Sequence, residues 1–165
     1  MTEMNNHKST PTIPEEVFIK DFKPMAGFYD FHVKKRKIKL SLKDLNVMGV
    51  ELKPKKQMKI AEVILEEMPL NTIVFSSSKK SQNVKNLMWT FRCLTAHPEN
   101  IEIVTIGGRE YYKIICWKKQ KDSNIPIMKG IVYSNEWPMF IDRIQSSIIK
   151  VEDKDNEKDN TISHE

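Results

Sequence analysis

The chain has 165 residues, of which 39% are hydrophobic and 30% charged, and its formal net charge is +5. Because domains of about 100–150 residues are the commonest size, this length predicts one globular domain and argues against two. No apolar run approaches the roughly 20 residues that span a bilayer, and the N-terminus lacks the apolar core of a signal peptide, so we expect a cytoplasmic protein.

The first 23 residues are predicted to form a flexible N-terminal arm. They contain the pair Asn5-Asn6 and two prolines, and they show little hydrophobic periodicity before Val17. Such composition is typical of chain termini that do not join a packed core. The single globular domain is then expected to cover residues 24–151. Three apolar residues of the arm are candidates for docking onto the body or for self-association with a neighbouring copy: Phe18, Ile19 and Phe22.

The segment from Phe28 to Leu42 is predicted to be a strand that carries four consecutive cations, Lys34–Lys37. Side chains of a strand alternate between its faces, but the apolar positions of this segment change parity between Val33 and Ile38. A bulge or break at the four cations would reconcile the two phases, since one extra residue exchanges the buried face. We therefore expect these cations to face outward.

The segment 54–68 is predicted to be an amphipathic helix with Pro54 in its first turn. Its lysines lie near the start and its glutamates near the end, against the preference of the helix dipole, which suggests that the lysines serve a ligand. Between His32 and Lys59 the chain holds ten Lys or Arg residues and two acidic residues. Such density favours RNA, a nucleocapsid or an anionic membrane surface as partner, and an ordinary solvated surface is the other interpretation. The proposed polyanion-binding residues are Lys34, Lys35, Arg36, Lys37, Lys39, Lys53, Lys55, Lys56 and Lys59.

The remaining segments predict an α+β fold. Residues 70–75 have the branched and aromatic content of a strand, and Gly107-Gly108 between two branched runs predicts a hairpin over about 101–117. Three amphipathic helices, over about 54–68, 79–96 and 136–149, are expected to pack on this small, mostly antiparallel sheet. The helix over 79–96 carries further cations outside its core stripe, namely Lys79, Lys80, Lys85 and Arg92. Residues 152–165 contain six acidic residues and two lysines and are predicted to form a disordered acidic tail.

No residue set forms a recognisable catalytic or metal-binding constellation. Cys93 and His97 have the i, i+4 spacing of two ligands on one helical face, but tetrahedral zinc needs further ligands. Cys93 and Cys116 both lie in apolar segments, where a reduced and buried thiol is expected. We therefore expect no catalytic residue, no metal, no cofactor and no small-molecule substrate, hence a protein that is not an enzyme.

Aromatic residues near the cations permit a base-stacking platform as well as a core. Tyr111, Tyr112 and Trp117 lie on the second strand of the predicted hairpin, and they would stack with bases if exposed. Lysine outnumbers arginine in the basic segment, which favours attraction to phosphates or headgroups over the reading of bases. Any nucleic-acid contact is therefore expected to be sequence-tolerant and weakened by salt.

The polar arm Met1–Lys23, the basic segment Phe31–Leu42 and the α+β block Pro54–Ile149 together resemble rhabdovirus matrix proteins, most of all those of plant-infecting cytorhabdoviruses. The resemblance implies a non-enzymatic structural protein of the virion and host cytoplasm that condenses the nucleocapsid, self-associates and bridges to the anionic inner face of the envelope. Animal members usually carry P-P-x-Y or a related budding motif, whereas this chain has only the tetrapeptide Pro11–Pro14, which approaches the P-[ST]-A-P pattern but has Ile13 in place of the small residue. The alternative is a single-stranded nucleic-acid-binding or silencing-suppressor module without a membrane role, which would use Tyr111 or Tyr112.

Overall fold

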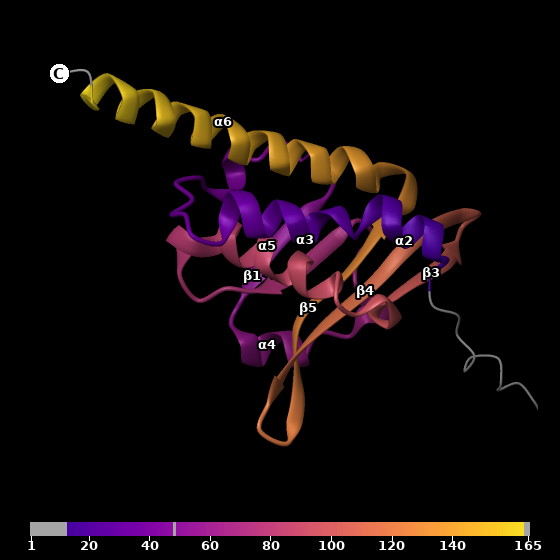
Figure 1. The fold of residues 1–165 in the computed structure, drawn as a ribbon. Helices are drawn as coiled ribbons and strands as arrows, with labels where there is room; N and C mark the ends of the chain where they lie inside the picture. The colour runs from indigo at the N-terminus through magenta and orange to yellow at the C-terminus, as the bar shows by residue number, and fades with distance from the viewer. Residues whose placement is uncertain (1–12, 48, 164–165) are drawn as a thin grey trace, which may run out of the picture.

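The computed structural model describes residues 13–47 and 49–163, with side chains up to Asp155. Its sheet has five strands in the order β1-β2-β5-β4-β3, in which β1 and β2 run parallel and all other neighbours run antiparallel (Figure 1). The predicted α+β class with a mostly antiparallel sheet is therefore confirmed. The strands are β1 (Glu51–Lys55), β2 (Thr72–Ser76), β3 (Ile101–Ile106), β4 (Arg109–Gln120) and β5 (Ser123–Tyr133).

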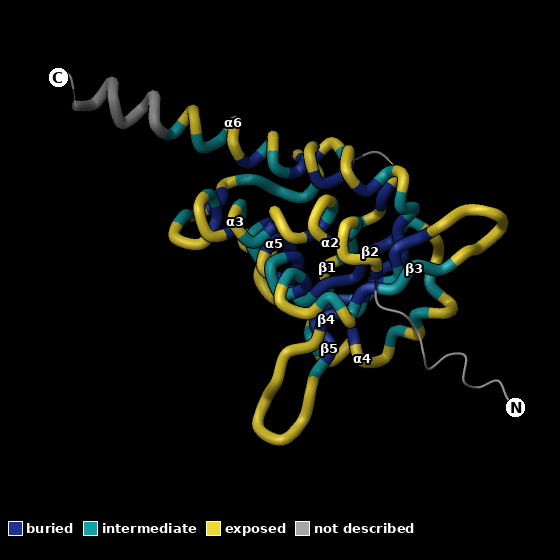
Figure 2. The backbone as a smooth tube through the Cα atoms, turned by 45° about the vertical axis from the view of Figure 1, so that its right-hand side comes forward, coloured by how far each residue is buried: buried dark blue, intermediate teal, exposed yellow. Residues whose placement is uncertain are grey.

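The predicted hairpin is confirmed as β3 and β4. Gly107 and Gly108 form its turn with φ angles of 59° and 81°, a conformation that glycine adopts without steric cost. A second, longer hairpin of β4 and β5 projects beyond the sheet with an exposed tip (Figure 2). Its register shifts between Cys116 and Trp117, where β5 holds one extra residue. This bulge bends the ladder at the base of the projecting part.

The main core lies between one face of the sheet and four helices, α2 (Glu15–Asp21), α3 (Pro24–Phe28), α5 (Asn83–Leu94) and α6 (Trp137–Ser163) (Figure 1). Trp137 is fully buried at its centre, with its ring centroid 4.9 Å from that of Phe22 and 5.7 Å from that of Phe91. The helices predicted over 79–96 and 136–149 are confirmed as α5 and the first part of α6.

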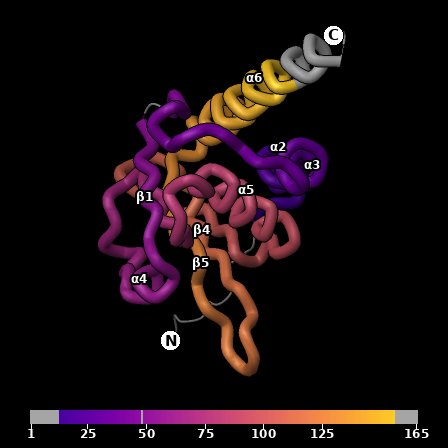
Figure 3. The backbone as a smooth tube through the Cα atoms, turned by 90° about the vertical axis from the view of Figure 1, so that its left-hand side faces the viewer, coloured from indigo at the N-terminus to yellow at the C-terminus, as the bar shows by residue number. Residues whose placement is uncertain are grey.

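The opposite face of the sheet is covered by α4 (Gln57–Ala61) and the 3-10 turn η3 (Leu65–Glu67), as Figure 3 shows. Along β2, Ile73 and Phe75 join the main core, whereas the alternating Val74 lines a cavity beside η3. Lys129 of β5 reaches the same side and donates a hydrogen bond of 2.7 Å to the carbonyl of Val63. The sheet therefore separates two differently covered surfaces.

The prediction of a flexible arm is wrong for residues 13–23. Residues 15–21 form α2, and Phe18 and Phe22 are buried in the main core. The Asp21 carbonyl accepts a hydrogen bond of 2.9 Å from Trp137 Nε1, which fixes the end of α2 to the start of α6. The globular unit therefore begins before residue 24. Residues 1–12, with half of the proline-containing tetrapeptide, lie outside the described part of the chain.

The predicted strand over Phe28–Leu42 is also wrong. The chain continues from α3 into a π-helical turn, η1 (Tyr29–Val33), in which the Lys34 amide donates to the Tyr29 carbonyl at 2.9 Å. The buried side chains of Tyr29 and Val33 lie one turn apart on this element. The chain is helical up to Val33 and non-helical from Lys37. This change of structure explains why the apolar positions change parity between Val33 and Ile38, without a bulged strand.

The helix predicted over 54–68 is replaced by a strand, a short helix and a 3-10 turn. Pro54 lies inside β1, which is an edge strand and therefore tolerates the missing N–H. Lys56 precedes α4, which ends at Ala61 after only five residues. The third helix of seven or more residues is therefore α2 at the N-terminus.

The acidic tail is helical where it was predicted to be disordered. α6 continues to Ser163, and its residues Glu152 and Asp155 contact His32 and Arg36 of the body. Two of the acidic side chains, Glu152 and Asp155, therefore have partners on another element. The prediction is wrong for residues 152–163, and residues 164–165 lie outside the described part.

Candidate polyanion-binding groove

The candidate site is a groove of about 700 Å³ between the segment Arg36–Ser41 and the residues Lys80–Lys85 around the start of α5. Ile38 and Leu40 contribute its apolar wall. Among the described residues, no acidic side chain lines it. We call this the basic groove, and its cations are Arg36, Lys37, Lys39, Lys80 and Lys85.

Local structure fixes both ends of the first wall. After η1 the Arg36 amide donates to the Val33 carbonyl at 3.1 Å, and the buried Ile38 anchors the segment in the core. At the other end, the backbone amide and hydroxyl of Ser41 donate to one carboxylate oxygen of Asp44 at 3.0 and 2.8 Å. The same two hydrogen bonds hold the pKa of Asp44 below its ordinary value. Lys37 and Lys39, which flank Ile38, are exposed.

The second wall is positioned by polar contacts around the start of α5. The Ser77 hydroxyl donates to Asn83 Oδ1 at 2.5 Å and accepts from Asn86 Nδ2 at 3.1 Å, which ties the preceding loop to the first turn of the helix. Lys85 Nζ donates to the Arg36 carbonyl at 2.8 Å and so joins the two walls. The groove is therefore held in shape by contacts between segments far apart in sequence.

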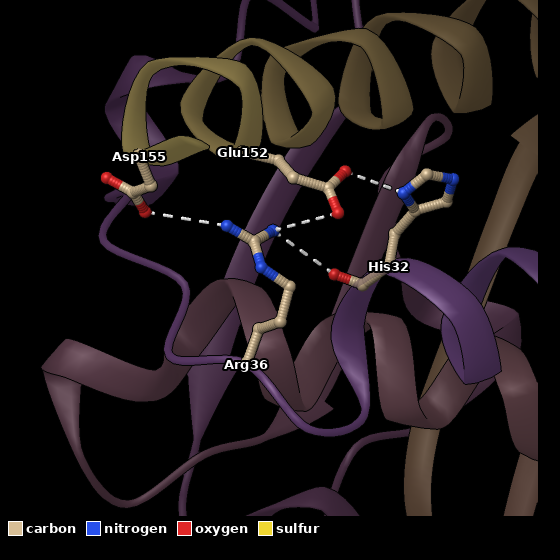
Figure 4. Close-up of polar contacts among 4 residues, drawn as sticks. All are labelled: His32, Arg36, Glu152 and Asp155. Carbon is tan, nitrogen blue, oxygen red and sulfur yellow. Dashed lines mark hydrogen bonds and ion pairs between the residues drawn. The ribbon is translucent and has the colours of Figure 1, made fainter. Parts of the chain in front are cut away.

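Arg36 is held by a cluster of four residues that links the groove to α6 (Figure 4). Its guanidinium lies 3.5 Å from Asp155 Oδ2 and 3.9 Å from Glu152 Oε2, and it donates to the His32 carbonyl at 3.3 Å. Glu152 also contacts His32 Nδ1 at 2.7 Å. Two carboxylates thus compensate the charge of Arg36, so the lysines of the groove provide its excess positive charge.

The nine predicted polyanion-binding residues do not form one surface. Lys37 and Lys39 lie in the basic groove with Arg36, whereas Lys53 and Lys55 lie across the sheet, in a cavity of about 290 Å³ that Glu62 and Glu67 also line. Two further predicted residues lie at α4. Lys56 directly precedes the helix and is exposed, and Lys59 belongs to the helix, with its Nζ 3.7 Å from Glu62 Oε1. The remaining two, Lys34 and Lys35, are exposed before the groove, and Lys34 lines a separate cavity beside α5.

Two groove residues, Lys80 and Lys85, were predicted only as general basic surface. Their position outside the core stripe of a helix was visible in the sequence. Their proximity to Arg36 was not, because it depends on packing between segments separated by 49 residues. A search for cations at the start of a helix would have found Lys80 and Lys85 but not the opposite wall.

The predicted self-association and base-stacking residues are mostly buried. Phe18 and Phe22 pack inside their own chain, whereas Ile19 is 47% exposed. Tyr111 and Tyr112 are also buried, so they cannot form an exposed platform. Desolvation, together with the hydrogen bond that its hydroxyl donates to Asp21, raises the pKa of Tyr112, so this phenol stays neutral in the core.

The described residues contain no cluster of three or more His, Cys, Asp or Glu side chains that would hold a metal ion. Both cysteines are free thiols, with Cys116 buried and Cys93 half-buried. In the part of the chain that the structure describes, no helix is both long and apolar enough to cross a bilayer.

The fold and the groove define a small α+β protein with a concave, lysine-rich surface. No protein-family model, curated protein or solved structure matches the chain.

Proposed function

We propose that the protein is a non-enzymatic, matrix-like structural protein that binds RNA or a nucleocapsid through the basic groove, self-associates and bridges to an anionic membrane. The observation that carries the proposal is the convergence of five cations from two distant segments on one groove that no described acidic side chain lines. A concave surface with one sign of charge attracts a linear polyanion strongly.

Phosphates are the expected ligands within the groove. Four of its five cations are lysines, which act as point charges and favour phosphate contact over bidentate recognition of bases. The one arginine, Arg36, already contacts Glu152 and Asp155. Binding should therefore tolerate sequence changes in the RNA and weaken steeply with salt.

A second lysine-bearing surface, which also contains Glu62 and Glu67, is the candidate for the bridging role. Lys53 and Lys55 lie across the sheet from the basic groove, and Lys56 and Lys59 flank or belong to α4 beside them. The side chain of Met58 is exposed on the same short helix. Lysines beside an exposed apolar side chain suit an anionic lipid interface. A protein that bridges two polyanions needs two such surfaces.

The test is co-sedimentation with RNA and with anionic liposomes across a salt series. The groove variant carries Lys37→Ser, Lys39→Ser and Lys80→Ser, and the matched control carries Lys53→Ser, Lys56→Ser and Lys59→Ser, so both lose the same charge. We expect the groove variant to lose RNA binding and the control to lose liposome binding. On single-stranded RNA, the slope of log affinity against log salt should fall by about 0.7 for each phosphate that the variant no longer neutralises.

The outcomes separate the proposal from its alternatives. Equal RNA binding by wild type and the groove variant would remove the basic groove from the mechanism. Binding of RNA without any binding of liposomes would support the single-stranded nucleic-acid module instead. Sedimentation equilibrium checks self-association, and a protein that stays monomeric at high concentration would contradict the matrix-like role.

A further inference from the structure

A second cavity, of about 290 Å³, lies beside the C-terminal half of α5. Two indoles from different elements line it, Trp89 of α5 and Trp117 of β4, and their residues are 44% and 40% exposed. We call it the tryptophan pocket. Its charged and titratable lining residues are Tyr29, Asp30, Lys34, Arg92, Cys93 and His97.

Both indoles are positioned by their surroundings. The Trp89 ring lies against the ring of the buried Tyr29, with centroids 5.9 Å apart. Trp117 follows the bulge of the β4–β5 hairpin, where the register changes and a side chain is re-aimed. Large aromatic side chains contribute most when buried, so two half-exposed indoles at one cavity indicate a surface that a ligand covers.

The tryptophan pocket continues the basic groove along the same two segments. Lys80–Lys85 at the start of α5 line the groove, and Trp89 lies one helical turn beyond Lys85. In the other wall, Lys34 lines the pocket and Arg36 begins the groove two residues later. The two cavities therefore follow one another along the same two segments, on either side of the Lys85–Arg36 contact.

The charges around the indoles favour a nucleotide over an apolar ligand. Lys34 and Arg92 are cations, but Arg92 Nε lies 3.2 Å from Asp30 Oδ1, so Lys34 provides the excess positive charge of the pocket. Phosphates would meet the cations, whereas an unpaired base offers a flat face to an indole. Bases in a duplex are already stacked on one another and do not present that face.

We propose that the tryptophan pocket binds an unpaired nucleobase by stacking, so that the nucleic acid in the adjoining basic groove is single-stranded. This inference rests on the proposed function, because the groove supplies the phosphate contacts. Stacking on one aromatic side chain raises affinity by about 5- to 150-fold per base, without strong sequence preference.

The test compares two fluorescently labelled oligonucleotides of equal length and charge, one of thymidines and one abasic, by fluorescence anisotropy at fixed salt. Wild type should bind the thymidine oligonucleotide about 5- to 150-fold more tightly. The variant Trp89→Leu, Trp117→Leu should lose this preference and keep its affinity for the abasic strand. Trp89→Phe, Trp117→Phe retains aromatic faces and should restore part of the preference.

Intrinsic fluorescence gives a second readout. The third tryptophan, Trp137, is fully buried, so quenching by the thymidine oligonucleotide should report Trp89 and Trp117. In the double leucine variant Trp137 is the one remaining tryptophan. Emission typical of a buried indole, together with an unchanged melting temperature, would show that the fold of this variant is intact.

The results distinguish the two proposals. Equal affinity of wild type for thymidine and abasic strands would overturn the base-stacking inference and leave the phosphate groove standing. A preference for bases that survives in the double leucine variant would also overturn it. Failure to bind either strand would refute the groove and this inference together.

Discussion

Removing Glu152 tests whether α6 is held to the body by its acidic side chains. The variant Glu152→Ala deletes the 2.7 Å contact with His32 Nδ1 and the 3.9 Å contact with Arg36 Nη1. Arg36 keeps Asp155 and the His32 carbonyl, so its charge is not left without partners. The change in stability therefore measures the contacts of Glu152 and not the burial of an orphaned cation.

The magnitude follows from the exposure of the three side chains, which is 19% for Glu152, 21% for Arg36 and 23% for His32. Exposed ion pairs contribute about 0.2–1 kcal/mol, and hydrogen bonds to charged groups about 1.5–3 kcal/mol. A pair that is four-fifths buried lies between these limits, so we expect the free energy of unfolding to fall by about 1–2 kcal/mol.

Urea unfolding followed by far-ultraviolet circular dichroism measures this decrease as a lower midpoint at an unchanged slope. The matched control is Asp153→Ala on the same helix, because Asp153 is exposed and no ion pair within the described residues involves it. Alanine has a higher helix propensity than glutamate or aspartate, so helix propensity alone would stabilise both variants. A double-mutant cycle with His32→Ala isolates the contact. Equal stability of the Glu152 and Asp153 variants, or effects that add within about 0.3 kcal/mol, would refute the reasoning.

Two further predictions address the N-terminal helix and the tryptophan pocket. Phe22→Ala should lower the free energy of unfolding by about 3–5 kcal/mol, because Phe22 is fully buried against Trp137. A decrease below about 1 kcal/mol in urea unfolding would support the flexible arm instead. The control is Ile19→Ala, on the exposed side of the helix. A hydrogen bond with the Cys116 thiol, helped by the nearby Arg92 and Lys118 charges, lowers the pKa of Cys93 below its ordinary value against the effect of its burial. The Cys93 thiolate therefore forms at lower pH than an ordinary thiolate, and alkylation by iodoacetamide should reach half its maximal rate at a lower pH than alkylation of free cysteine does. Cys93→Ser should abolish labelling, since Cys116 is buried with a raised pKa, and labelling at Cys116 or a midpoint at or above that of free cysteine would contradict the expectation.

The parts of the fold that local signals determine were predicted well. Gly107-Gly108 between branched runs predicted the β3–β4 hairpin because only glycine adopts those φ angles easily. The apolar stripe of α5 predicted its buried face, since helical periodicity is preserved over several turns. Both signals are contained within a few consecutive residues.

The incorrect predictions concern segments whose tertiary contacts override local preference. Tyr29 and Val33 have strand-forming side chains, yet both are buried one turn apart against the helical layer. Pro54 suits the first turn of a helix and also an edge strand, and the pairing of β1 with β2 decides between them. Neither outcome can be read from the segment alone.

Only one wall of the basic groove was predicted from the sequence as part of the candidate site. The cations from Arg36 to Lys39 were recognised from their density, but the opposite wall at Lys80–Lys85 was not joined to them. The contact between Arg36 and Asp155 spans 119 residues, so charge counting assigned the tail and the basic segment to separate units. The density of cations in the sequence indicated the first wall of the basic groove. Packing of distant segments determines which of these cations have no acidic partner and remain available to a ligand.

The position of Pro54 limits how copies of this protein can join through their sheets. The five-stranded part of the sheet has two edge strands, β1 and β3, and β1 combines a missing N–H with the flanking Lys53 and Lys55. Such an edge resists strand addition, whereas β3 carries no proline. A copy added at β3 would meet its partner's β3, and the pair would then present two β1 edges. Association through the edges of the five-stranded part should therefore stop at a closed dimer, and filaments in which β1 edges pair with one another would contradict this limit.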